Sequence, residues 1–480
     1  MATTTVLPSD GQPSAEKPPN PPDDDGSSSD PDAPNTTQND NAPASCPSKK
    51  PCKNNRGWRK IVRNFTPSWF AVNMGTGIVS ILLFNLPWNG YWLHVISYIF
   101  FALNVLLFVI FFIISFLRYT LYPEIWPAMI AHPAQSLFLG CFPMGFASKL
   151  FSPSPPIHLR SISHTTLLFP TISHHTSYIF TKSKLIPNPA IINMMIFACS
   201  HWGSGLIYLA WSFWWLDAII SMATCISMPF IVMHRHRPGL DKTTATLLLP
   251  IVPAVVAAAT GGIVADALPS SGHAYATLVV SYALWGIGQA LSGCVLALYF
   301  HRLTIHSLPP RDVIVSVFLP IGPLGQGGFG IQQLGKVALK VVPQTAMFRV
   351  SGVDAARGAE FLYFLGVFFG IVMWGFALAW VCFALISLRT TRSFPFNMGW
   401  WGFTFPLGVW ATCANALWQN LDSEFFKYVT TIISLSVVIL WILVALRTVQ
   451  LALTGEMFFA PCLKDLREKE EPPVSEDGAV

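Results

Sequence analysis

The sequence predicts an all-α integral membrane fold of ten transmembrane helices, arranged as five hairpins around a central pore with an inner ring formed by the odd-numbered helices. Composition is the first observation: the 480 residues are 52% hydrophobic and only 11% charged, whereas soluble domains contain about 25% charged residues. The second is a series of long apolar runs, and the third is a proline motif repeated in alternate runs. The composition excludes an ordinary soluble enzyme, a nucleic-acid-binding protein and a disordered scaffold.

The two ends of the chain differ from its middle in composition. Residues 1–57 are rich in Pro, Ser, Asp and Asn and contain no aromatic residue, so they lack the apolar surface needed to fold. Residues 461–480 are charged and contain proline. We therefore predict disordered tails at 1–57 and 461–480, on either side of a transmembrane domain at 58–460. The nine cysteines are scattered without zinc-ligand spacing, which predicts buried thiols and no metal site.

Ten apolar runs approach or exceed the roughly 20 residues that a helix needs to cross a bilayer. Short polar turns, such as residues 85–90 and 269–272, separate neighbouring runs and favour helical hairpins. The predicted spans are Trp69–Leu86, Tyr91–Leu117, Gln135–Ala147 (resuming at Ile191), Gly205–Met233, Thr244–Leu268, Ala274–Phe300, Val313–Lys336, Glu360–Leu388, Pro395–Gln419 and Phe425–Leu453.

The distribution of Lys and Arg between the spans predicts the orientation. A basic run from Lys49 to Arg63 precedes the first span, and basic residues follow the fourth, sixth and eighth spans. The turns after the first and fifth spans contain no Lys or Arg. Because cytoplasmic loops carry an excess of Lys and Arg, we predict that both termini are cytoplasmic. The loop after the seventh span, with four basic residues between 336 and 357, is an exception.

A short motif recurs in the odd-numbered spans. It reads FPMG at 142–145, FLPIG at 318–322 and FPLG at 405–408, and the fifth span contains LPIVP at 249–253. Proline removes a backbone donor and kinks a helix, and the freed carbonyls must then face protein or a wet cavity at membrane depth. Kinks on alternate spans therefore predict that these helices surround a common pathway. The other interpretation is that proline is simply tolerated in membrane helices.

The aromatic residue beside each proline has two interpretations. Phe142, Phe318 and Phe405 occupy equivalent positions of the motif, and a ring of such side chains would close a narrow pore by excluding water. Alternatively, each Phe is ordinary packing in an apolar helix. The motif prolines that we place along the pathway are Pro143, Pro253, Pro320 and Pro406.

Several motifs together resemble the tellurite-resistance/dicarboxylate transporter family, which is also the slow anion channel-like family. They are NFTPSWF at 64–70, MGTG at 74–77, HPAQ at 132–135, GCFPMG at 140–145 and WWGFTFP at 400–406. Within that family the chain is most similar to the fungal sulfite efflux pumps. The resemblance covers about residues 58–460 and implies ten helices in five hairpins, a homotrimer with one pore per protomer, and export of sulfite across the plasma membrane.

The slow anion channels of plant guard cells share the fold that this resemblance implies. Their gating phenylalanine lies on the ninth helix, directly before the helix break. The position in this chain that matches it is Phe405, so the resemblance implies that Phe405 gates the pore.

The predicted inner helices contain few cations, so anion selectivity must come largely from backbone N–H groups and polar side chains. Each candidate polar side chain is alternatively an interhelical contact. Lys336 and Lys340, four residues apart, either attract anions at the outer mouth or anchor the helix at the interface. The polar candidates are Asn73, Thr76, Gln135, Gln326 and Thr404.

Three ionisable residues lie in or near the spans. Asp217 falls in the middle of the fourth span, where a charge costs at least ~2.5–3.5 kcal/mol. It predicts a structural contact between hairpins or protomers, with proton coupling as the alternative. His132 and His94 are candidates for titration near neutral pH, or are satisfied buried histidines.

The glycine-rich seventh span resembles two phosphate loops without being either. GQGGFG at 325–330 fits G-x-G-x-x-G, and 330–336 nearly fits a P-loop, but Val337 stands where Ser or Thr would hold magnesium. Neither follows a strand, so we interpret the glycines as permitting either close helix packing or a flexible pore helix. We find no catalytic or metal signature and predict no enzymatic activity and no cofactor.

Residues 148–190 interrupt the third span. They are rich in Ser, Thr, His and Pro, and removing them joins the sequence before 148 to Ile191 as one apolar helix. A polar backbone inserted at membrane depth leaves groups unsatisfied at several kcal/mol each. The hypothesis is a translated retained intron or a gene-model error, which spliced transcripts lacking the segment would reveal. The alternative is a genuine extruded loop or a histidine-rich regulatory site.

Taken together, the sequence predicts a multi-pass plasma-membrane protein that exports sulfite or bisulfite through a Phe-gated pore and so detoxifies sulfite. Its expected partners are the anion, the lipid bilayer and two further copies of the chain, with no nucleic acid. The alternatives are a malate or C4-dicarboxylate transporter of the same family and a passive gated anion channel.

Overall fold

The computed structural model describes residues 57–88, 90–146, 204–236, 239–345, 354–391 and 393–463. All of them belong to the compact unit Lys53–Val480. The predicted N-terminal tail up to residue 56, the segment 148–190 and the chain from 464 onward lie outside the described residues. Within the described ranges the regular elements are all helical.

Eight helical segments are long and apolar enough to cross a membrane, as expected for a multi-pass membrane protein. Each coincides with a predicted span. The segments are Pro67–Phe84, Tyr91–Leu121, Gly205–His236, Ala245–Ala267, Ser271–His306, Arg311–Gln344, Ala355–Thr390 and Glu424–Thr454.

The two remaining predicted spans are also helical where they are described. Of the third span, the structure describes η3 (Ser136–Gly140) and α5 (Cys141–Phe146). The ninth is η10 (Met398–Gly402) followed by α13 (Thr404–Leu421), which contains 18 residues. The total of ten membrane-crossing helices therefore stays a prediction.

The α-helices alternate between a buried and an exposed class. In the segments that contain α2 (Phe70–Phe84), α9 (Val252–Ala267) and α11 (Ile321–Val341), 89–94% of the most apolar 18-residue stretch is buried. In those that contain α3, α8, α10, α12 and α14 the buried share is only 17–39%, although these helices are just as apolar. Exposed apolar surface of this extent suits contact with lipid. The bounds of the exposed class are α3 Tyr91–Leu121, α8 Ser204–Ile231, α10 Ser271–His306, α12 Ala355–Thr390 and α14 Glu424–Thr454.

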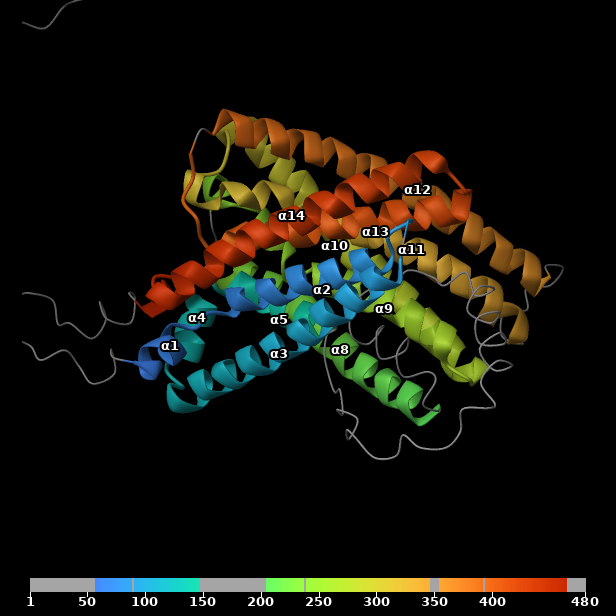
Figure 1. The fold of residues 1–480 in the computed structure, drawn as a ribbon, viewed down its shortest axis with the longest axis horizontal. Helices are drawn as coiled ribbons and strands as arrows, with labels where there is room; N and C mark the ends of the chain where they lie inside the picture. The colour runs from blue at the N-terminus through green and yellow to red at the C-terminus, as the bar shows by residue number, and fades with distance from the viewer. Residues whose placement is uncertain are drawn as a thin grey trace, which may run out of the picture. The chain divides into compact units, whose positions relative to one another are not determined.

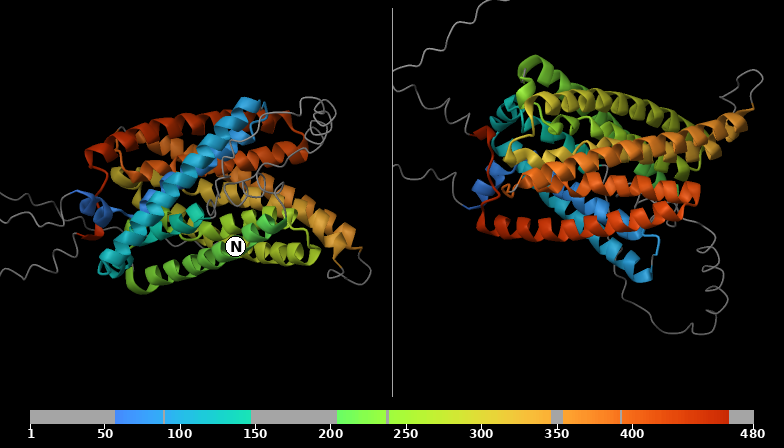
Figure 2. Two further views of the ribbon diagram at one scale, coloured as in Figure 1. Left: turned by 60° about the horizontal axis from the view of Figure 1, so that its bottom comes forward. Right: turned by 90° about the horizontal axis from the view of Figure 1, so that it is seen from above.

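The buried helices contact one another in a closed circuit. Each touches the next in the order α2, α5, α9, α11, α13 and back to α2. Each of α3, α10, α12 and α14 packs against the buried helix that precedes it in the chain, and α8 packs against α9. Figure 1 shows two such pairs, α2 with α3 and α13 with α14, and Figure 2 shows the second pair (orange to red) from two further sides. This arrangement agrees with the prediction that alternate helices form an inner layer.

A 3₁₀ segment precedes each of the five described inner helices. These segments are η2 (Pro67–Trp69), η3, η7 (Ala245–Leu248), η8 (Arg311–Phe318) and η10. The motif prolines lie at the junctions: Pro253 is the second residue of α9, and Pro320 is the N-cap of α11. The predicted mid-helix kinks are therefore starts of α-helices, where a missing N–H leaves no intrahelical bond unmade.

The glycine run of α11 packs against neighbouring helices along one continuous helix. A Cβ atom on Gly325 would lie 2.6 Å from the backbone nitrogen of Trp410, and one on Gly335 would lie 2.8 Å from the carbonyl oxygen of Leu362. Only a residue without a side chain allows α13 and α12 to approach this closely. The interpretation of these glycines as packing sites is confirmed.

Two short helices and a C-terminal segment were not predicted. They are α1 (Trp58–Asn64), α4 (Ile125–Ala131) and residues 455–463, whose Ala460, Cys462 and Leu463 pack against α4. The fully buried Arg118 of α3 donates hydrogen bonds to the carbonyl oxygen of Arg63 and to Sγ of Cys462. Packing therefore continues to Leu463, three residues beyond the predicted domain end at 460.

Candidate functional site

A large cavity lies at the end of the bundle where the inner helices begin. Its volume is about 920 Å³. Residues at the 3₁₀-to-α junctions and first turns of all five described inner helices line it. These lining residues are Ala71 and Met74, Cys141 and Met144, Leu249 and Val252, Leu319 and Gly322, and Phe405 and Pro406.

The cavity wall has few charges and they are mixed in sign. Lys242 and His236 line it, as do Asp312 and Glu456. The N-terminal ends of α2, α9, α11 and α13 are directed at it, and a helix N-terminus carries about half a positive charge on its free N–H groups. An anion can therefore be accommodated here with little help from cationic side chains.

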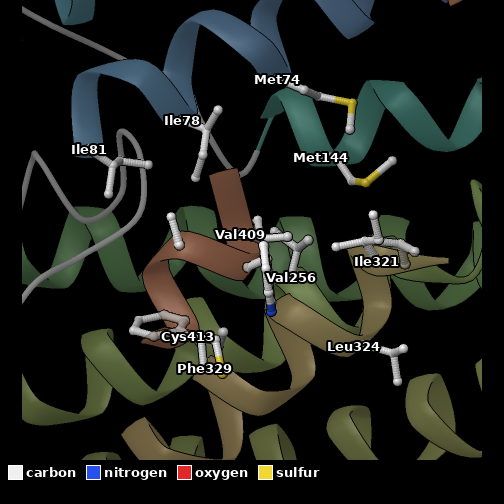
Figure 3. Close-up of a cluster of buried hydrophobic side chains, with 14 of the residues drawn as sticks. Met74, Ile78, Ile81, Met144, Val256, Ile321, Leu324, Phe329, Val409 and Cys413 are labelled. Atoms are coloured by element: carbon white, nitrogen blue, oxygen red, sulfur yellow. The ribbon is translucent and has the colours of Figure 1, made fainter. Parts of the chain in front are cut away.

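The inner end of the cavity is closed by buried apolar side chains. Met74 of α2 and Met144 of α5 line the cavity and also belong to the main hydrophobic cluster. Behind them lie Ile78, Val256 and Val409, each at most 7% exposed. Figure 3 shows side chains from α2, α5, α9, α11 and α13 meeting in this cluster. A dry apolar constriction of this kind blocks ions because water is excluded from it.

A second, small pocket lies between the far ends of α11 and α13. Its volume is about 10 Å³, room for about one water molecule. Most of the side chains in its wall are polar. Phe329, which is 1% exposed, lines the pocket on one side and belongs to the main apolar cluster on the other. Its lining residues are Phe329, Gln332, Gln333, Lys336, Ala416, Gln419 and Asn420.

The structure does not bring the three motif phenylalanines together. Phe405 lines the large cavity and is half-buried. Phe142 instead packs against the rings of Phe70 and Phe108, and Phe318 packs edge-on against Phe403 at 4.9 Å. Neither Phe142 nor Phe318 lines the cavity. The alternative interpretation, ordinary packing, fits these two, and a gating role stays a prediction for Phe405 alone.

Two of the predicted polar pathway residues are interhelical or local contacts. Thr76 Oγ1 donates to the carbonyl oxygen of Val72 and accepts a hydrogen bond from the indole N–H of Trp441 at 3.1 Å. Thr404 is fully buried and donates to the carbonyl oxygen of Trp401. The hydrogen-bonding capacity of these hydroxyls is used within the protein, as the alternative interpretation holds.

Three other predicted polar residues keep unused hydrogen-bonding atoms. Gln135 lines the large cavity, and its Oε1 makes no hydrogen bond to the described residues. Asn73 and Gln326 are at most 2% exposed, and both amide atoms of Asn73 and Nε2 of Gln326 lack a partner there. Because buried amides are almost always satisfied, these groups are candidates for hydrogen bonds to water or to a passing anion. Of the predicted prolines, Pro406 lines the cavity, whereas Pro143, Pro253 and Pro320 do not.

The two predicted outer lysines have different surroundings. Lys340 Nζ forms an ion pair with Asp266 Oδ1 of α9 at 2.9 Å. Lys336 lines the small polar pocket and makes no ion pair or hydrogen bond within the described part of the chain. Both lysines therefore interact with Asp266, and their role at an outer mouth stays a prediction.

None of the three ionisable candidates lines either cavity, but His132 directly precedes Pro133, Ala134 and Gln135, which line the large one. Asp217 is fully buried on α8, and neither carboxylate oxygen has a hydrogen-bond partner among the described residues. His132 Nδ1 accepts hydrogen bonds from the backbone N–H groups of Ala134 and Gln135. The ring of His94 packs edge-on against Phe84. The two histidines are thus held by local contacts.

Several residues of this region were missed by sequence reasoning. Met74 and Met144 stand within quoted motifs but were not assigned to the barrier, and Phe329 lies inside the glycine run, which drew attention to phosphate loops instead. Asn415 is 2% exposed, and neither of its amide atoms has a hydrogen-bond partner among the described residues. Its signal was an amide in the middle of an apolar span, the same signal that identified Asn73.

A bundle of buried helices, covered by exposed apolar helices and with a cavity at one end, is typical of a multi-pass membrane protein. The chain belongs to the SLAC1 family, described as voltage-dependent anion channel, which it matches over residues 64–449. This is a family of channels and transporters rather than of enzymes.

Fungal members of the family are similar over most of their length. The sulfite efflux pump SSU1 of Trichophyton rubrum is 43% identical over 398 residues, covering 83% of this chain and 93% of that protein. The protein of the same name from Arthroderma benhamiae matches with the same identity and coverage. The malic acid transport protein of Schizosaccharomyces pombe is 23% identical over 426 residues, covering 87% of this chain and 84% of that protein.

Proposed function

We propose that this chain exports sulfite or bisulfite across the plasma membrane and so removes a toxic anion from the cell. The observation that carries the proposal is the 43% identity to proteins named sulfite efflux pump, over 93% of their length. The bundle supports it, since buried inner helices surround a cavity of about 920 Å³ that is closed by an apolar barrier. We infer a homotrimer from the family resemblance.

The orientation that we propose places both termini and the large cavity on the cytoplasmic side. The cavity lies at the ends where the inner helices begin, next to the C-terminal segment that contributes Glu456 and Met457 to its wall. An anion then enters a wide cavity from the cytosol before it meets the barrier. This arrangement suits export, because the collecting volume faces the compartment from which substrate is removed.

The proposed gate is Phe405, at the edge of the cavity. Its ring stands at the 3₁₀-to-α junction of α13, next to Pro406. Beyond it, Met74 and Met144 with the apolar side chains behind them form the dry barrier. Opening requires these side chains to move aside, so that water and the anion pass together.

Selectivity in the proposed pathway comes from weak, neutral donors. Helix N-termini attract the anion in the cavity, and the unpartnered amides of Asn73, Gln326 and Asn415 are available to donate hydrogen bonds at the depth of the barrier. Weak sites suit transport, because an ion that binds tightly does not leave.

The proposed domain extends over 58–460 with ten spans, and residues 148–190 are proposed to be a translated intron. The third span would then be a single helix that joins α5 to the chain after 190. Transcript sequencing tests this directly, since spliced reads lacking the segment support it and uniformly retained reads contradict it.

A malate or C4-dicarboxylate transporter is the second candidate, favoured by the similarity to the malic acid transport protein. A dianion of that size needs fixed cationic ligands in the pathway, and the described inner helices place Lys336 and Lys340 only at the far end. A passive gated channel is the third candidate. It differs from a proton-coupled exporter in that its anion flux does not depend on a pH gradient.

The test is anion flux from proteoliposomes that contain the full-length protein or the version without 148–190. Sulfite and malate are loaded separately, with and without an imposed pH gradient. Sulfite flux supports the proposal. If sulfite carries a current that does not depend on the imposed pH gradient, the protein is a channel. The proposal is contradicted if correctly assembled protein transports malate but not sulfite. If only the shortened chain transports sulfite, residues 148–190 are absent from the working protein.

A further inference from the structure

The small pocket at the far end of the bundle is built from fixed amides. Tyr363 OH donates to Asn420 Oδ1 at 3.3 Å, and Asn420 Nδ2 donates to Gln332 Oε1 at 3.0 Å. Gln332 Nε2 in turn donates to the carbonyl oxygen of Gly328 at 2.9 Å. This chain of hydrogen bonds runs from α12 through α13 to α11 and fixes which edge of each amide faces the pocket.

Two further amides line the same pocket without being used in this network. Gln333, 4% exposed, and Gln419 make no hydrogen bond within the described ranges. Each carries two N–H donors. One hydrogen of Asn420 Nδ2 is also left over after its bond to Gln332. The pocket therefore offers several neutral donors that lack acceptors.

The charge at this pocket is not balanced. Lys336 contributes an ammonium group to the wall, and Asp266 is the carboxylate that acts on it. Lys340, however, already holds Asp266 in an ion pair at 2.9 Å. The two lysines exceed the single aspartate by one positive charge, and a partly buried ammonium without a counter-ion is costly.

The backbone makes the same end of the bundle unfavourable for anions. α11 ends at Val341 and α13 ends at Leu421, and the C-terminal end of a helix carries about half a negative charge. A side-chain cation is therefore needed if an anion is to rest here, in contrast to the end where the inner helices begin.

We propose that Lys336, with the amides of Gln333, Gln419 and Asn420, forms a binding site for a small oxyanion at the far end of the pathway. The ligand class follows from the site: one ammonium and several N–H donors match an anion with several oxygen acceptors. The pocket of about 10 Å³ takes one oxygen, and the rest of the anion lies at its exposed mouth beside Gln419.

This inference rests on the proposed function, because it assigns the site to sulfite or bisulfite that has crossed the barrier at Phe329. Lys340 acts indirectly by occupying Asp266, which would otherwise neutralise Lys336. One cation and an open mouth keep the site weak enough to release the anion.

The experiment measures binding apart from transport. Purified full-length protein in detergent is titrated with sulfite at low ionic strength, and the rise in thermal stability gives an apparent Kd. Lys336→Gln should weaken binding about tenfold, the effect of one charged hydrogen bond, and Lys336→Arg should restore most of it. Lys427→Gln is the matched control, since Lys427 is a lysine of α14 already paired with Glu424; its Kd should equal that of the native chain.

A second pair of variants tests the role of the ion pair. Lys340→Gln frees Asp266 and should weaken binding, and adding Asp266→Asn should restore it. Unchanged sulfite binding in Lys336→Gln, with a normal gel-filtration profile, overturns the site even if the liposomes export sulfite. If the liposomes carry malate alone while oxyanion binding still depends on Lys336, the proposed function fails and the site stands.

Discussion

The two ends of the inner bundle differ in the charges that surround their cavities. At one end, a cavity of about 920 Å³ is surrounded by the starts of the inner helices and lined by charges of both signs. At the other, a pocket of about 10 Å³ lies where α11 and α13 end, and its wall contains Lys336 and several amides. Helix starts attract anions without side-chain cations, whereas helix ends repel them. In the proposed oxyanion site, Lys336 offsets the unfavourable backbone polarity at the far end.

The barrier between the two ends is apolar and tightly packed. Phe329 touches both the small pocket and the central cluster, and Met74 and Met144 touch both the cluster and the large cavity. The apolar barrier therefore lies between the large cavity and the small polar pocket. The following predictions test this division.

Phe405→Ala should have the largest effect. Removing the ring at the edge of the large cavity takes away the proposed gate, and we expect anion leak to rise by about tenfold or more, equivalent to ~1.4 kcal/mol or more of barrier height. Whole-cell currents, normalised to surface expression, measure it. Currents equal to those of the native protein at equal expression would remove Phe405 from gating.

A comparison of Lys336→Gln with Lys242→Gln tests the difference between the ends. We expect the half-saturating sulfite concentration on the far side to rise about tenfold in the first, because one cation carries that site. Lys242→Gln should change the half-saturating sulfite concentration on the cavity side less than about threefold, since helix N-termini supply most of the attraction there. Flux measured from each face of oriented vesicles gives both values. Equal effects at the two ends would show that backbone polarity does not matter.

Asp217→Asn should have little effect on transport. The carboxylate is fully buried on α8, away from both cavities, and the neutral amide has the same shape. We expect sulfite flux to keep its response to a pH gradient, with unchanged or increased thermal stability, since an unpartnered buried carboxylate is costly. Loss of a pH-gradient response present in the native protein would instead assign proton coupling to Asp217.

Thr76→Val should have the smallest effect. It removes the hydrogen bond from Trp441 to Oγ1 of Thr76, which joins α14 to α2. Such contacts in membrane proteins are worth about 0.6 kcal/mol. We expect a slightly lower unfolding temperature and an unaltered flux per folded molecule. A change in anion selectivity would return Thr76 to the pathway.

Much of the fold followed from the sequence because a bilayer imposes simple rules. Within the described residues, apolar runs identified all eight helices that are long enough to cross a membrane. The repeated proline motif identified α5, α9, α11 and α13 as a class apart. The motif was read as a kink, however, and it marks the start of an α-helix. Proline restricts the backbone in both cases, and only the preceding 3₁₀ segments distinguish them.

The site was predicted less well than the fold. Of the three phenylalanines, Phe405 alone lines the cavity, although Phe142 also stands directly before its motif proline. Phe318 lies one residue earlier in its motif, and Leu319, directly before Pro320, lines the cavity instead. A shared motif fixes the backbone position, but the direction of each ring depends on its neighbours. Phe142 packs against the rings of Phe70 and Phe108, and Phe318 packs against Phe403.

The sequence by itself determined that this protein crosses a membrane repeatedly, which helices are sheltered, and to which family it belongs. These properties depend on composition and on local repeats, which are readable in one dimension. Tertiary structure alone decided that Lys340 forms an ion pair with Asp266 while Lys336 lines the small pocket, and that Phe329 lies between that pocket and the apolar cluster. The surroundings of a lysine or of an aromatic ring depend on residues of other helices that are distant in the sequence. A local sequence pattern does not predict which of these residues come into contact.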